Sequence, residues 1–319
     1  MKRAVLEQTR LSSNKKTGRL ESRTWKLMLR NWQLYVLVLP AVIYLIVFQY
    51  APLYGLQIAF KQYSATKGIW ASPWVGFDQF ERFFQSASFV TTLTNTLYLS
   101  VYELILFPIP IVLALLMNHL VGPYKSVVQT ILYWPHFIST VVLVGMLSLF
   151  LNPRSGLVNH FLGSAGLPSV HFMAEPGWFS SIFVWSGVWQ NAGWGTIIYL
   201  AALTAIHPEL HEAAIMDGAN KLDRIRHIDL PGIMPTVIIM LLLAFGSFMT
   251  VGFEKAYLMQ NPQNAPASEI IQTYVYKSGL LGAQFSYSSA VGLFNNAVNF
   301  LILVVMNGIL KKLKQTTLW

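Results

Sequence analysis

The chain alternates long apolar segments with short polar ones. A helix needs roughly 20 apolar residues to cross about 30 Å of hydrocarbon. The segments that reach this length are 34–60, 89–120, 127–151, 179–206, 233–253 and 287–310. Several contain proline or glycine, which membrane helices tolerate when neighbouring helices or a polar cavity satisfy the freed backbone groups. The pattern predicts an all-α integral membrane protein with six transmembrane helices.

Composition agrees with the membrane assignment. Of the 319 residues, 54% are hydrophobic and 11% are charged, whereas about a quarter of the residues in soluble domains are charged. Cysteine is absent, which excludes disulfides and thiolate metal sites. Residues 1–33 do not match a cleavable signal peptide, because the basic region is too long and no small-residue cleavage site follows it.

The basic residues orient the chain. Sixteen lysines and arginines fall in the N-terminal tail, the second and fourth loops and the C-terminus, against six in the other loops. The positive-inside rule therefore places both termini in the cytoplasm. The net charge of +9 reflects this bias together with attraction to anionic lipid, and no basic soluble domain is left to bind nucleic acid. The predicted organisation is a basic tail (1–33), a transmembrane domain (34–310) and a C-terminal tail (311–319).

The fourth loop, residues 207–231, is a polar island that includes most of the stretch HEAAIMDGANKLDRIRHIDLPG. Pro208 suits the first position of a helix, and Gly218 ends or bends that helix. A second short helix follows and is expected to end at Pro231. Its apolar stripe is Leu222, Ile225 and Ile228. The pattern predicts two short helices joined at a glycine on the cytoplasmic side.

The spacing of this loop resembles a known motif. Glu-Ala-Ala at 212–214, Gly218, then Ile228 and Leu230-Pro231 is similar to the EAA loop of permease subunits of binding-protein-dependent ABC importers. Segments 188–203 and 252–262 also resemble that family, and the ending TTLW resembles its oligo- and polysaccharide branch. The resemblance covers roughly residues 30–319. His211 and Ile225 depart from the usual Tyr and Phe but are within reach of the same packing role.

The resemblance implies a type I ABC importer permease fold. It implies a multi-pass subunit of the bacterial cytoplasmic (inner) membrane that forms half of the pathway for a carbohydrate, most simply an oligosaccharide or polysaccharide fragment. The implied partners are a second homologous permease, two cytoplasmic ATPase subunits, an extracytoplasmic solute-binding protein and the surrounding membrane lipid. In the family this loop docks in a groove of the ATPase. The implied ATPase-coupling residues are Glu212, Ala213, Ala214, Asp217, Gly218, Ala219, Ile228, Leu230 and Pro231.

The chain is not expected to be an enzyme. It lacks the G-x-x-x-x-G-K-[ST] motif that cradles ATP phosphates, so ATP and Mg²⁺ are expected in the partner ATPases, and no cofactor in this chain. His207 and His211 lie four apart, but Pro208 stands where a zincin motif needs glutamate. We therefore expect no catalytic and no metal site.

Polar side chains inside the spans are candidates for the substrate pathway, because such residues face a cavity or another helix. Glu103 is the only acidic residue within a span, and it fits a pathway contact, a buried acid bonded to a neighbouring helix, or an interfacial position. The fourth span combines tryptophans with amides, as sugar sites do, although these residue types also anchor helices at interfaces and join them. The candidates are Glu103, Asn95, Trp189, Gln190, Asn191, Trp194, Asn295, Asn296 and Asn299.

A single intramembrane carboxylate also fits a second class of protein, a single-chain ion-coupled carrier using Glu103. That class predicts inverted repeats, and none is visible in this sequence. Two further features each allow two interpretations. The segment 133–140, YWPHFIST, fits a gate or a kink, and Glu254 with Lys255 fits either a rim for the binding protein or interfacial solvation.

Overall fold

The computed structural model describes residues 30–120, 122–313 and 317, which are helical apart from connecting loops and an isolated bridge between Lys61 and Trp74. The chain divides into two compact units, residues 1–57 and 58–319. In the first, α2 (Trp32–Leu45) leads into a π-helical turn, η1 (Ile46–Tyr50). The helical path continues through η2 (Ala51–Phe60) and gives an apolar segment of 29 residues. The prediction for this segment is confirmed within two residues.

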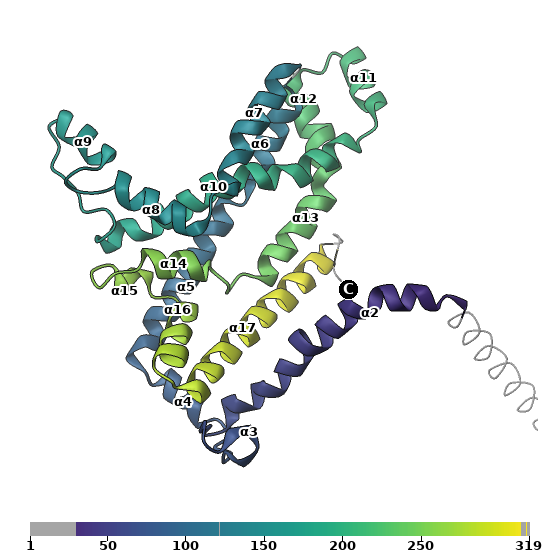
Figure 1. Ribbon diagram of the computed structural model, residues 1–319. Helices are drawn as coiled ribbons and strands as arrows, with labels where there is room; N and C mark the ends of the chain where they lie inside the picture. The colour runs from purple at the N-terminus through teal and green to yellow at the C-terminus, as the bar shows by residue number, and fades with distance from the viewer. Residues whose placement is uncertain (1–29, 121, 314–316, 318–319) are drawn as a thin grey trace, which may run out of the picture. The chain divides into compact units, whose positions relative to one another are not determined.

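Long helices build the second unit (Figure 1). They are α5 (Ala87–Leu106), α6 (Pro108–Asn118), α10 (Pro176–Thr204), α13 (Leu230–Gly246) and α17 (Phe285–Lys312). Helix α10 packs against α5, α6 and α13, and α13 packs against α17. Shorter helices connect them: α3 (Gly68–Ala71), α4 (Asp78–Phe84), α9 (Leu157–Ser164), α14 (Phe253–Met259), α15 (Ala265–Ser268), α16 (Ile271–Tyr276) and η5 (Lys277–Leu281).

A buried apolar cluster holds α6, α10 and α13 together. Its fully enclosed members include Ala114 of α6 and Ile233 of α13, with Tyr199 and Leu203 from α10 between them. Small residues let these helices approach closely, as is common in membrane bundles. A Cβ on Gly193 of α10 would lie 1.9 Å from the carbonyl oxygen of Leu132 in α7 (Pro123–Tyr133).

The third apolar segment is bent, so the kink reading of segment 133–140 describes its geometry. Helix α7 and the turn η3 (Trp134–Phe137) meet α8 (Thr140–Phe150) at 97°. Ile138 and Ser139 between them are extended, with ψ of 126° and 152°. The bend frees the carbonyl of Ile138, which accepts a hydrogen bond from Nε2 of Gln190 in α10 at 2.7 Å. This bond satisfies a backbone group that hydrocarbon would leave unpaired.

The expectation that Pro231 ends a short second helix is wrong. One helical path runs from Lys221 to Gly246, through α12 (Lys221–Arg224), the π-helical turn η4 (Ile225–Asp229) and α13. Proline interrupts a helix because it lacks an N–H and its ring crowds the carbonyl four residues earlier. The wider turn immediately before Pro231 relieves that crowding, so the fifth span begins inside the loop.

Within the described part of the chain, four helical segments are long and apolar enough to cross a membrane, and the bent α7–α8 pair raises this to five. Helix α10 is 29 residues long and falls outside this set. The helical membrane fold is therefore confirmed, while the count of six and the cytoplasmic termini stay predictions.

Candidate coupling loop and intramembrane cavity

The loop between α10 and α12 contains one helix, α11 (Pro208–Met216), which ends at a fixed turn. Gly218 follows it with φ of +81°. The N–H of Ala219 donates to the carbonyl of Ala214 at 2.9 Å, and the N–H of Gly218 donates to Ile215 at 3.0 Å. This pair of bonds is the Schellman ending of a helix, for which glycine suits the left-handed position. The predicted helix–glycine joint is present.

The start of the next helix is fixed as firmly. The side chain of Asn220 accepts hydrogen bonds from the N–H groups of Leu222 and Asp223, at 2.8 and 3.0 Å. In return, the Asp223 carboxylate accepts the N–H of Asn220 at 3.0 Å. Such a reciprocal capping box satisfies backbone donors at a helix start. The loop is therefore a rigid helix–turn–helix.

Helix α11 offers an exposed surface of apolar and small side chains. None of its residues is buried, and Met216 is 87% exposed. Leu210 and Ile215 are also exposed, as are Glu212 and Ala213. These exposed apolar side chains make α11 a candidate surface for contact with another protein or a membrane.

The second part of the predicted coupling set lies deeper in the molecule. Ile228 and Leu230 are half-buried while Pro231 is exposed, and Leu230 packs against the α6–α10–α13 cluster. Of the predicted apolar stripe, Ile225 joins that cluster, but Leu222 is 72% exposed. The bundle therefore covers only part of this stripe.

One acidic residue of the polar loop has no exposure at all. Asp229, in η4, is fully buried. Its Oδ2 lies 3.5 Å from Nε2 of His119, the C-cap of α6, and its Oδ1 lies 3.4 Å from Nε2 of His211 in α11. We call these three residues the histidine–aspartate cluster. Local sequence patterns do not reveal the cluster, because His119 is far along the chain from the other two residues and only the fold brings all three together.

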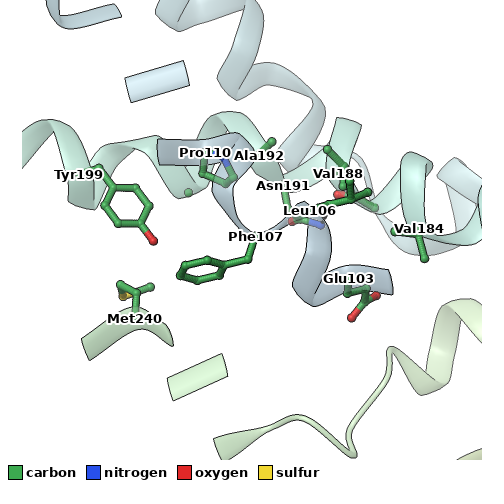
Figure 2. A pocket seen from close by; sticks show the side chains of 12 residues that line it. Glu103, Leu106, Phe107, Pro110, Val184, Val188, Asn191, Ala192, Tyr199 and Met240 are labelled. Carbon is green, nitrogen blue, oxygen red and sulfur yellow. Dashed lines mark hydrogen bonds between the residues drawn. The ribbon is translucent and has the colours of Figure 1, made fainter. Parts of the chain in front are cut away.

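A cavity of about 340 Å³ opens between α5, α6, α10 and α13. Figure 2 shows Phe107, Tyr199 and Met240 facing one another at one side, with the Glu103 carboxyl on the other. Asn191 supplies a second polar group. The lining is otherwise mostly apolar, as is usual in pockets that take a small ligand or a ligand segment.

The nine predicted pathway residues are not brought to one place. Glu103 and Asn191 share this cavity. Asn295 and Asn296 line another of about 450 Å³, beside Gln272 and Tyr276. Trp189 is half-exposed in α10. Trp194 stacks on His136, with ring centroids 4.5 Å apart and planes at 7°.

Several of the predicted amides bond to backbone instead of facing open space. Asn95 donates to the carbonyls of Pro266 and Glu269, at 2.9 and 3.0 Å. Asn299 accepts the N–H of Met249 at 2.8 Å and donates to Gly246, and Asn295 donates to Met249 at 3.3 Å. These bonds satisfy the backbone where α13 and the α15 segment end. Together with the Gln190–Ile138 bond, they favour a structural role for four of the amides.

Lys255 does not lie on an exposed rim. It is 8% exposed in α14, its Nζ donates to the carbonyl of Phe183, and the charge lies 4.7 Å from the Phe183 ring centroid. The charges of Lys255 and Glu103 also interact. Gly187 leaves room for the ammonium, since a Cβ there would lie 3.1 Å from Nζ. The rim interpretation is therefore wrong for Lys255, because the folded chain gives it a carbonyl, a ring face and a carboxylate.

Comparison with known proteins identifies the class to which this arrangement of helices and loop belongs. Residues 107–315 match the family of binding-protein-dependent transport system inner membrane components. The chain belongs to this family of permeases, as the Glu-Ala-Ala loop suggested. This membership favours the importer subunit over the ion-coupled carrier.

Particular relatives cover nearly the whole chain. Protein LplB of Bacillus subtilis (strain 168) is 41% identical over 91% of this chain and 92% of its own length. The polygalacturonan/rhamnogalacturonan transport system permease protein YteP of the same strain is 42% identical over 89% of each chain.

Solved structures agree with the sequence relatives. The crystal structure of a bacterial ABC transporter involved in the import of the acidic polysaccharide alginate matches with a TM-score of 0.85. It is 41% identical and covers 91% of this chain and 99% of that one. A second structure, in complex with an alginate pentasaccharide-bound periplasmic protein, matches with a TM-score of 0.85 at 40% identity, over 92% of this chain and 99% of that one.

Proposed function

We propose that this chain is a permease subunit of an ATP-driven importer for oligosaccharides, and that the first class to test is the acidic, uronate-containing kind. The observation that carries this proposal is the 40–42% identity over about nine-tenths of the chain to relatives described as transporting polygalacturonan and alginate. A binding protein would deliver the saccharide from outside the inner membrane, and the chain would form half of the pathway.

The coupling loop would meet one of two cytoplasmic ATPase subunits. The support is physical: α11 is exposed, carries apolar side chains beside Glu212, and is held rigid by the turn at Gly218 and the cap at Asn220. A rigid helix transmits displacement better than a mobile loop. Leu230 would connect that movement to the helix bundle because it packs against it, and Ile228, two residues earlier, is half-buried.

The saccharide would pass the cavity lined by Glu103 and Asn191. The Glu103 side chain is exposed, and its charge interacts with that of Lys255. The cavity lining therefore offers polar groups to the saccharide without a large unbalanced charge. Trp189, Trp194 and Asn296 stay candidates for further contacts, since each is exposed. A homologous second permease would supply the facing half.

Transport by the reconstituted complex tests the proposal. The permease, its homologous partner, the ATPases and the binding protein are assembled in vesicles, and ATP-dependent uptake is compared for oligogalacturonides, alginate oligosaccharides and a neutral malto-oligosaccharide. Uptake of acidic but not neutral sugars is expected. Uptake of neutral sugars alone would contradict the substrate class, and no uptake of any sugar would contradict the function.

A charge reversal tests the docking role separately. Glu212→Lys is expected to lower ATPase association and uptake together, while Glu175→Lys, the same change at an exposed position at the start of α10, leaves both unchanged. If Glu212→Lys binds the ATPases as the wild type does, the docking surface lies elsewhere.

A further inference from the structure

The histidine–aspartate cluster joins three elements that otherwise serve different parts of the molecule. His119 caps α6, His211 belongs to α11, and Asp229 lies in the turn that leads into α13. Asp229 has no exposed surface, and each of its carboxylate oxygens faces a different imidazole nitrogen, at 3.4 and 3.5 Å. The cluster therefore has a fully buried carboxylate at its centre and a partly exposed imidazole on either side.

The Asp229 carboxylate has no other partner to take the place of the two imidazoles among the described residues. Within the described residues, neither oxygen of Asp229 accepts a hydrogen bond at ordinary geometry. A buried carboxylate that loses its partner is left without water or compensating charge, which is strongly unfavourable. Moving His211 away from Asp229 is consequently costly, and the three residues are expected to move as one.

This connection matters most for α11, which is loosely attached elsewhere. The helix has no buried residue, and Figure 1 shows it projecting beyond the ends of α6, α7 and α12. Apolar packing therefore contributes little to its placement. The contact between His211 and Asp229 is a specific link from the exposed helix to the interior.

The other two elements lead from the cluster to the cavity. His119 is the C-cap of α6 and Asp229 is the N-cap of α13. Farther along the same two helices, Pro110 of α6 and Met240 of α13 line the cavity. At 1.5 Å per residue, both paths are about 15 Å long. A displacement of α11 can thus reach two walls of the cavity through two short helices.

We propose that His119, Asp229 and His211 form the joint through which movement of the coupling helix is transmitted to α6 and α13, and so to the cavity. The three are positioning residues, and the inference rests on the proposed function as an importer subunit. A merely structural cluster would affect assembly, whereas a joint affects the link between ATP hydrolysis and the delivered substrate.

The experiment uses the complete transporter in lipid nanodiscs, with oligogalacturonide as the probe. It compares wild type, Asp229→Asn, His211→Phe and His211→Tyr. His160→Phe is the control, because His160 is an exposed histidine in α9 outside the loop. The readouts are co-purification of the ATPases and the ratio of ATP hydrolysis with and without the loaded binding protein.

Asp229→Asn and His211→Phe are expected to keep the ATPases and basal hydrolysis but to lower the stimulation ratio about tenfold, within the usual range of coupling between sites. His211→Tyr keeps a hydrogen-bond donor on an aromatic ring, so it is expected to restore most of the ratio. The control is expected to match the wild type.

Three results would overturn the joint. These are a wild-type ratio in His211→Phe, equal impairment of the Phe and Tyr variants, or loss of ATPase assembly in Asp229→Asn and His211→Phe. Failure of the proposed function looks different, because the wild-type complex itself would then show no ATP-driven uptake in vesicles and no stimulation by the loaded binding protein in nanodiscs.

Discussion

Replacing Gly218 by alanine tests whether the shape of the coupling loop determines how well it binds an ATPase. Gly218 has φ of +81°, and a Cβ there would meet no atom within 4 Å. Any effect of alanine is therefore due to backbone conformation and not to a steric clash with a neighbour. Glycine adopts this left-handed conformation freely, whereas an alanine in it costs about 1–2 kcal/mol.

The structure bounds the size of the effect. If alanine stays in place, the loop carries that strain. If the backbone relaxes, the bonds Ala219–Ala214 and Gly218–Ile215 are lost, at about 1 kcal/mol each. Either way about 1–2 kcal/mol separates the variant from the docking geometry, which corresponds to roughly 5- to 30-fold weaker binding. Asparagine tolerates the left-handed region better than alanine, so Gly218→Asn is expected to lose clearly less.

The assay is the dissociation constant of the labelled ATPase for the permease pair in nanodiscs. Gly246→Ala serves as the control, since Gly246 ends α13 without positive φ and has open space around it. The expected order of affinity is wild type, then Asn, then Ala. If Gly218→Ala binds as tightly as the wild type, the turn does not set the docking geometry and the reasoning fails.

The remaining predictions concern packing, capping and the intramembrane amides. Gly193→Ala forces a Cβ to within 1.9 Å of the Leu132 oxygen and is expected to destabilise the protein by about 1–3 kcal/mol. The measurement is the thermal unfolding temperature, which is expected to fall. Gly177→Ala in the same helix is the control, because a Cβ there meets nothing within 4 Å, and its unfolding temperature is expected to stay that of the wild type. Asn220→Ala removes a helix cap worth about 1 kcal/mol, and faster backbone amide exchange at Leu222 and Asp223 is the measurement; unchanged exchange would contradict the capping role. Gln190→Ala leaves the Ile138 carbonyl unpaired, at about 1–3 kcal/mol, so the unfolding temperature should fall while the KM for uptake stays constant; a raised KM at unchanged stability would restore Gln190 as a substrate contact.

Periodicity and loop chemistry made much of this protein readable from its sequence. The apolar segments predicted membrane helices because a helix needs about 20 apolar residues in a row to cross the hydrocarbon. The joint at Gly218 was also readable, since a glycine after a run of good helix formers is a local signal that needs no distant partner. The Glu-Ala-Ala spacing then pointed to the permease family, and the match over residues 107–315 confirmed it.

The sequence was less informative where a residue's role depends on what lies across from it. An amide that binds a sugar and an amide that binds a freed backbone carbonyl occur in the same local sequence pattern. Only the folded structure shows that Gln190 donates to the carbonyl of Ile138, which the bend leaves free. The continuation of the helix through Pro231 depends on a π-helical turn that has no residue code.

What the sequence determined by itself was set by local chemistry: membrane helices from apolar length, a rigid loop from a glycine and a cap, and a family from the spacing of a few residues. The tertiary structure alone decided which charges are enclosed. Lys255 and Asp229 look like surface residues in the chain, yet both are buried, because partners more than 70 residues away in each case, Phe183 and His119, lie beside them in the folded protein.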